Sequence, residues 1–177
     1  MSSEGQLLLR SAARHLSEHV PAGLIVEGSG GKGRPTFTPW VGFFDPRETM
    51  SPEDGLYVVY LFGAELEGVT LSITQGITKL SKELGVRPAR MKLATDAAAI
   101  RSGLRAHDTS GWEPTMNLGS LKFRQLAYEA GNVLARQYSI PELPPEAILV
   151  HDLHASIELY HLAIAVKRQL RQAGYLV

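Results

Sequence analysis

Apolar residues follow two different periods along the chain, and these periods predict where strands and helices lie. Residues 56–62 and 69–73 are rich in β-branched and aromatic side chains and are bounded by glycine, proline and aspartate, which is typical of strands. The apolar run 41–44 precedes them, and 24–26 is a short strand candidate. Because only polar turns separate 41–44, 56–62 and 69–73, we expect three neighbouring strands of one antiparallel sheet.

Helical periodicity predicts elements at both ends of the chain. Ser2 or Ser3 can cap a first helix, which ends near Pro21. Further helices are predicted over 77–84, 89–104 and 145–174. The segment 116–126 alternates only in part and is compatible with a strand at the sheet edge, while 128–138 fits either a helix or an extended chain.

These elements predict a single α+β domain, in which a curved, mainly antiparallel sheet is wrapped by N-terminal and C-terminal helices. A length of 177 residues suits one domain with a proper core. We expect the sheet core at about 24–76, a helical basic segment at about 77–105 and a closing helix at about 145–174.

Composition removes several classes of function. Lysine plus arginine equals aspartate plus glutamate at 18 each, so any nucleic-acid surface must come from charge segregation. The lack of cysteine excludes disulfides, thiol catalysis and cysteine zinc sites. No signal peptide and no apolar run of roughly 20 residues is evident, so we expect a soluble protein of the cytoplasm that does not contact membranes.

A glycine-rich loop, GSGGKG at 28–33, is the most unusual local feature. It matches G-x-G-x-x-G formally, but Arg34-Pro35 and Pro39 follow it, so the helix that a dinucleotide site requires is not expected. The P-loop pattern also fails, because Lys32 is followed by glycine. The loop is therefore either a plain surface loop or one that approaches a phosphate chain, where glycines permit close contact and Lys32 and Arg34 supply charge.

Basic residues concentrate in 87–105, the most lopsided charge segment of the chain. Its positive side chains outnumber the single acid, Asp96. The segment fits either a solvated helix face or a surface that faces phosphates.

Catalytic patterns are weak. His154, Glu158 and His161 share one face of the predicted C-terminal helix at spacings of four and three residues, which can hold a metal. No H-E-x-x-H arrangement and no G-x-S-x-G elbow is present, and neither a GTPase nor a nuclease motif is found. A metal-dependent enzyme that uses this face is one alternative, and solvent-exposed side chains are the other.

Trp40, Tyr57 and Leu61 form the most informative apolar set. In a strand, Tyr57, Val59 and Leu61 point to one side of the sheet and Val58 and Tyr60 to the other. Trp40, in the preceding strand, can sit across from Tyr57 and Leu61. Taken alone, this arrangement fits ordinary core packing.

The order of these features resembles a known family. A glycine loop, Pro39-Trp40, Asp45-Pro46, the G-L-Y-V-V-Y-L run at 55–61 and the L-S-I-T-Q-G run at 71–76 are similar to the N-terminal DNA-binding domain of McrB-type restriction enzymes, which depend on modified cytosine. The resemblance is strongest over 31–76 and continues more weakly into the C-terminal helix.

The resemblance implies a role in recognising duplex DNA that carries a modified cytosine, with the base flipped out of the helix. Trp40, Tyr57 and Leu61 match the positions that line the base pocket of that family. In this reading the DNA backbone or groove would meet Gly31, Lys32, Gly33 and Arg34 of the glycine loop. The concentration of positive charge in 87–105 adds Arg87, Arg90, Arg101 and Arg105 as further phosphate contacts. The resemblance implies no cofactor for the chain and no enzymatic activity of its own. A GTP-hydrolysing motor domain and a separate nuclease subunit would be its partners.

One position departs from the family pattern. Lys32 stands between two loop glycines where the pattern can carry an aromatic residue that wedges into the vacated base stack. A lysine cannot stack as a ring does, so Trp112 or Arg34 would take that part.

Another alternative to DNA recognition is a protein-interaction or small-ligand domain whose pocket binds a free nucleobase or another flat molecule.

Overall fold

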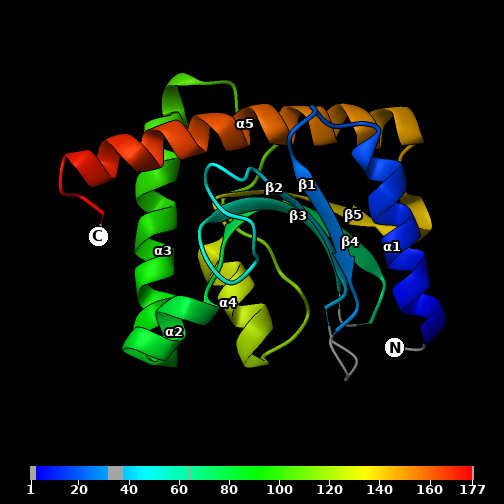
Figure 1. The fold of residues 1–177 in the computed structure, drawn as a ribbon, viewed down its shortest axis with the longest axis horizontal. Coiled ribbons are helices and arrows are strands. Elements are labelled where there is room, and N and C mark those ends of the chain that lie inside the picture. The colour runs from blue at the N-terminus through cyan, green and yellow to red at the C-terminus, as the bar shows by residue number, and fades with distance from the viewer. Residues whose placement is uncertain (1–2, 32–37, 64, 177) are drawn as a thin grey trace.

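The computed structural model of the protein describes residues 3–31, 38–63 and 65–176. Within these residues the chain has a mixed α+β fold with one five-stranded antiparallel sheet, which is open and has the order β1-β2-β3-β4-β5 (Figure 1). The strands are β1 (Ile25–Ser29), β2 (Trp40–Phe44), β3 (Leu56–Phe62), β4 (Gly68–Gln75) and β5 (Leu134–Ser139).

Helices cover both faces and both flanks of this sheet. In Figure 1, α5 runs along one side of the sheet and α4 lies on the other, while α1 and α3 stand at opposite flanks. The helices are α1 (Ser3–Ser17), α2 (Thr78–Leu84), α3 (Val86–Gly103), α4 (Phe123–Gly131) and α5 (Glu146–Gln172). None of the helices in the described part of the chain has an apolar stretch long enough to cross a membrane.

The sheet separates two apolar clusters. The larger cluster lies on the face of the sheet that packs against α5, and it includes Val58 and Tyr60 of β3 and Tyr160 of α5. The smaller one lies on the opposite face, and we call it the second cluster. Its members are Trp40, Phe44, Tyr57, Val59, Leu61, Met116, Leu118, Tyr128 and Ala135. The predicted alternation along 56–62 is therefore confirmed, because neighbouring β3 residues belong to different clusters.

The α1 helix crosses closely over the edge strand β1. A Cβ atom added to Gly28 would lie 2.2 Å from the backbone oxygen of Leu9, so only glycine permits this approach. The Gln6 side chain fastens the same crossing, since its Nε2 donates to the Gly28 carbonyl at 3.3 Å and its Oε1 accepts from the Gly30 amide at 2.7 Å. The N-terminal helix thus holds the start of the glycine loop.

The expected edge strand over 116–126 is wrong. The second half of this segment enters α4, and Leu121, which the alternation placed in a strand, is 90% exposed. Buried α4 residues instead follow helical spacing, as Gln125 and Tyr128 do. The true edge strand is β5, within the stretch that fitted either a helix or a strand, and it pairs with β4 through Ile73 and Leu134.

Candidate functional site

Trp40, Tyr57 and Leu61 lie together on one face of the sheet. Trp40 is directly opposite Leu61 across the β2–β3 ladder, and Tyr57 lies four residues earlier on β3. All three belong to the second cluster. The structure therefore brings together the three residues that the resemblance assigns to a base pocket, in the shared-face arrangement that the alternation along β3 predicted.

These side chains form a closed cluster and not an open hollow. Trp40 is 9% exposed, Tyr57 1% and Leu61 0%. Met116 and Leu118, from the segment before α4, are buried in the same cluster, as is Tyr128 of α4. A planar ligand could reach the indole only if this cover moved.

Gly42 leaves room between two rings of the second cluster. It lies between Trp40 and Phe44 on β2, and a Cβ atom at this position would be 2.7 Å from the Phe44 ring and 3.2 Å from the Trp40 ring. The two rings pack edge to face with centroids 6.3 Å apart. The missing side chain is thus what allows the indole and the phenyl ring to approach each other.

Two buried polar groups near this cluster have unused hydrogen-bonding capacity. The Gln125 Oε1 atom is buried without a hydrogen-bond partner among the described residues, and the buried Tyr57 hydroxyl has the nearby Tyr128 phenol as a polar neighbour. The Gln125 amide nitrogen donates to Thr38, two residues before Trp40, and Gln125 lies one turn from Tyr128 on α4. Such groups cost free energy in the free protein, and a ligand with a polar edge can satisfy them.

Burial disfavours the ionised form of both tyrosines of this cluster. Loss of solvation raises the pKa of Tyr57 well above its ordinary value of 10.0, and the nearby Tyr128 phenol raises it further. Burial also raises the pKa of Tyr128. A phenol is already protonated at neutral pH, and the raised pKa values extend this state further into the alkaline range, so each hydroxyl can donate a hydrogen bond.

The covering segment is held by a few polar contacts. The Leu118 amide donates to the Glu129 carboxylate at 2.8 Å. Asn117 and Gln137 exchange two bonds, from the Asn117 amide to the Gln137 Oε1 at 3.3 Å and from the Gln137 Nε2 to the Asn117 carbonyl at 3.0 Å. Because Asn117 and Gln137 are exposed, water can replace these two bonds at little net cost in free energy.

The glycine loop begins beside Trp40. Ser29, the last residue of β1, pairs with Trp40, the first residue of β2, and Gly30 and Gly31 follow. A surface hollow of about 460 Å³ adjoins this point, between α1 and β1, and its lining includes Arg10 and Arg14 of α1 with Glu27, Gly28 and Gly31. The predicted contacts Lys32, Gly33 and Arg34 lie outside the described residues.

Comparison with known protein families shows which family the chain belongs to. The family described as "MrcB-like, N-terminal domain" matches residues 3–164, which is most of the chain. The chain belongs to this family. Membership supports a DNA-binding module of the McrB type. A search of curated proteins found no match to this chain.

The MrcB-like domain carries the arginines of 87–105 on a different side from α1, the helix that holds the start of the glycine loop at Gly28 and Gly30. Figure 1 shows α3 and α1 flanking the sheet on opposite sides. Arg87 and Arg105 are exposed and Arg90 is half-buried. Arg101 is engaged within the protein, because its Nη1 donates to the carbonyls of Asn132 at 2.9 Å and Val133 at 2.8 Å. Phosphate contact by these four residues stays a prediction.

Trp112, one of the two residues expected to replace the wedge aromatic, packs elsewhere in the domain. It belongs to the larger cluster, where the Arg136 guanidinium lies 4.9 Å from its ring centroid. This position is on the opposite side of the sheet from Trp40, so Trp112 does not adjoin the second cluster. The wedge assignment to Trp112 does not fit this arrangement.

The histidine face of α5 does not form a metal-ligand group in the described part of the domain. The Nε2 atom of His154 lies 2.6 Å from the His19 carbonyl, and His161 stacks on Tyr160 and lies 3.8 Å from Asp45. The group whose ligand atoms do come close is a different one, made by His15, His19 and Glu146.

Several residues of this site could not be selected from the sequence. Sequence patterns give no reason to place Met116 and Leu118 in the cluster of Trp40, because a connecting segment sets their position. Tyr128 and Gln125 share an α4 face, and helical periodicity over 123–131 is the signal that could have found them. Arg10 and Arg14 stand four residues apart on the predicted first helix, a spacing that gives a shared face but identifies no binding partner.

Proposed function

We propose that this domain recognises modified cytosine in duplex DNA by receiving the flipped base into the second cluster. The observation that carries the proposal is the grouping of Trp40, Tyr57 and Leu61 on one sheet face beside the start of the glycine loop. A flipped base needs flat apolar surfaces on which to stack, and the indole and phenol rings provide them.

The polar groups of Gln125 and Tyr57 are complementary in hydrogen-bonding type to the edge of a cytosine. Cytosine carries an amino donor at N4 and acceptors on its ring, whereas Gln125 Oε1 is an acceptor and the neutral Tyr57 hydroxyl is a donor. A modifying methyl group adds only about 0.8 kcal/mol of burial. Selectivity therefore depends on how closely the cluster wall, including Phe44 above Gly42, fits the base.

Base entry requires the cover of the cluster to open. Exposing one large apolar side chain such as Met116 or Leu118 costs roughly 1.5–3 kcal/mol, and stacking one base returns about 1–3 kcal/mol. Unpairing the base costs a few kcal/mol more. The base alone cannot supply the affinity, so contacts to the phosphate backbone must do so.

Arg10 and Arg14 supply such contacts in the proposal. Both are exposed on α1, and both line the hollow that adjoins the glycine loop. The loop itself contributes Lys32 and Arg34 by sequence. GTP hydrolysis and DNA cleavage would lie on other domains or subunits, as the resemblance to McrB-type enzymes implies.

The test compares duplexes that differ only in one cytosine. Fluorescence anisotropy with plain, 5-methyl, 5-hydroxymethyl and N4-methyl cytosine duplexes should show tighter binding to at least one modified form, with affinity that falls steeply as salt rises. Trp40→Ala should reduce that preference. Equal affinity for all four duplexes would contradict the proposal, and binding of a free nucleobase without salt dependence would favour a small-ligand domain.

A further inference from the structure

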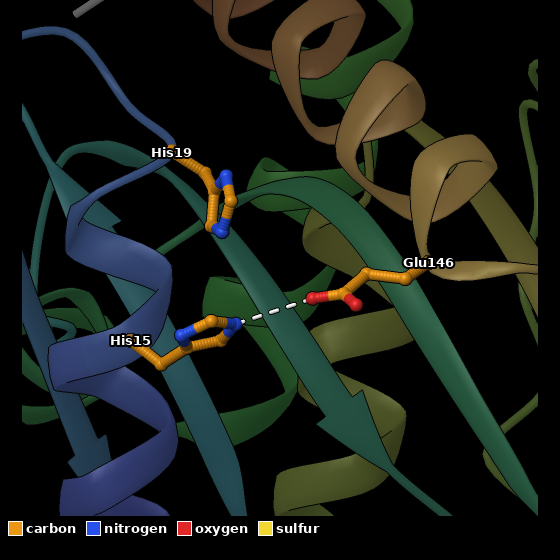
Figure 2. Close-up of side chains that lie close together, drawn as sticks. All are labelled: His15, His19 and Glu146. Carbon is orange, nitrogen blue, oxygen red and sulfur yellow. Dashed lines mark hydrogen bonds and ion pairs between the residues drawn. The ribbon is translucent and has the colours of Figure 1, made fainter.

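We propose that His15, His19 and Glu146 bind a zinc ion that joins the end of α1 to the start of α5. The proposal does not depend on DNA recognition. Figure 2 shows the three side chains converging from two helical regions that are far apart in sequence. Each can offer one ligand atom, and these atoms all lie within 4.8 Å of one another.

The two histidines lie close together at the C-terminal end of α1. His15 is in the last turn of α1, and His19 is in the turn that follows Ser17, where its amide donates to the Leu16 carbonyl. Their ring centroids lie 5.1 Å apart, with the ring planes at 75°. Glu146 is the first residue of α5, and its Oε1 lies 3.2 Å from the His15 Nε2. In Figure 2 a ring nitrogen of His19 faces the gap between the other two groups.

The separations suit a tetrahedral ion after small side-chain movements. Zinc–nitrogen and zinc–oxygen bonds of about 2.0–2.2 Å place neighbouring tetrahedral ligands about 3.4 Å apart. The His15–Glu146 pair is already near this value. Because the side chains of His15 and Glu146 are 58% and 74% exposed, they can rotate to complete the set without disturbing the core.

His19 provides an independent sign that the group is incomplete. Its Nε2 atom is buried and has no hydrogen-bond partner among the described residues. A buried ring nitrogen without a partner is costly, whereas a metal bound by the imidazole uses its lone pair and fixes the tautomer. The His19 backbone is already held, since its carbonyl lies 2.6 Å from the Nε2 of His154 on α5.

The donor set selects the class of ion. Two imidazoles and one carboxylate suit zinc and related transition metals, whereas magnesium and calcium prefer oxygen ligands. Three protein ligands leave one tetrahedral position for water. The site would fasten the α1 end near α5, at the opposite end of the helix from Gln6, which holds the glycine loop.

The experiment uses the 177-residue chain without a polyhistidine tag, stripped with EDTA and desalted. Isothermal titration with zinc chloride should give one ion per chain, and the melting temperature should rise with zinc concentration. His15→Ala and Glu146→Gln should each weaken zinc binding at least about tenfold. Both positions are exposed, so the variants should fold as the wild type does.

His107→Ala is the matched control, because this histidine is also exposed but lies outside the group. It should bind zinc as the wild type does. The proposal is overturned if the stripped wild type binds no zinc ion, or if His15→Ala binds zinc as tightly as the wild type and His107→Ala do. Because the zinc titration contains no DNA, its failure would leave the proposed DNA recognition to its own test.

Discussion

Trp40 faces Leu61 directly across the β2–β3 ladder, at the end of the sheet where the glycine loop begins. This pairing places the Trp40 indole and the Leu61 side chain on the same face of the sheet, and Tyr57 lies on that face four residues before Leu61. The hydrogen-bonded pairing of β2 with β3 thus positions the proposed base-binding residues.

Gly42→Ala should disturb both stability and base selection. The added Cβ would lie 2.7 Å from the Phe44 ring, which is fully buried and cannot move freely. Overpacking of this kind costs about 1–3 kcal/mol, measurable by urea denaturation. Gly63→Ala is the control, because its Cβ would meet its nearest neighbour at an ordinary 3.5 Å. Equal stability of both variants would contradict the account of Gly42.

Tyr160→Phe should destabilise the domain without altering DNA selectivity. The Tyr160 hydroxyl accepts a bond from the Asp45 amide at 3.1 Å and donates one to the Leu56 carbonyl at 2.9 Å, so it joins the end of β2 to the start of β3. Its removal leaves buried backbone groups unpaired, at a cost of about 1–3 kcal/mol. Chemical denaturation measures the loss. Tyr175→Phe, at an exposed position, should change stability little, and a similar loss there would count against the assignment.

Asp45 should make stability depend on pH in the acidic range. The side-chain hydrogen bonds from Arg47 lower the pKa of Asp45 below its ordinary 3.8, despite the opposing effect of burial. A lowered folded-state pKa contributes stability that is fully present above the unfolded value and is lost as pH falls through the folded value. Melting temperatures measured from about pH 5 downward should therefore fall less steeply in Asp45→Asn.

Arg47→Met separates the ion pair from the turn that Asp45 also forms. It removes the principal cause of the lowered pKa while Asp45 still accepts the backbone amide at 47. The acid-dependent loss of stability should shrink relative to the wild type. An unchanged slope in both variants would show that Asp45 does not carry this dependence.

Arg10→Gln combined with Arg14→Gln should weaken binding to modified and plain duplexes by similar factors. For each phosphate that the variant no longer neutralises, the slope of log K against log salt should decrease in magnitude by about 0.9. Arg171→Gln is the control, since this exposed residue is at the C-terminal end of α5 and outside the α1–β1 hollow. A change in selectivity with an unchanged salt slope would contradict backbone contact by Arg10 and Arg14.

The strands and the shared face of the site were predictable because β-branched and aromatic residues dominate 56–62 and 69–73. Alternation alone assigned Tyr57 and Leu61 to the same side. The α4 helix was missed, because Leu121 and Phe123 imitate a strand pattern although both are exposed. The local sequence pattern could not predict contacts between distant segments, such as the burial of Met116 and Leu118 in the second cluster.

The zinc group shows the same limit more sharply. His15 and His19 are recognisable as a pair from their spacing, but Glu146 is 131 residues from His15. Only the packing of α1 beside the start of α5 brings the carboxylate to the imidazoles. The sequence analysis instead grouped His154 and His161 with Glu158, because their spacing places them on one face of a single predicted helix.

The most direct test of base capture uses Trp40 as its own reporter. The chain has two tryptophans, so Trp112→Phe leaves the indole at 40 as the single source of tryptophan fluorescence. Its melting temperature first establishes that this variant is folded. At saturating concentrations checked by anisotropy, a duplex with the preferred modified cytosine should quench or shift this emission, because a base stacks on the indole. A plain duplex should change it far less. Identical emission with bound modified DNA, bound plain DNA and no DNA would contradict entry of the base into the second cluster.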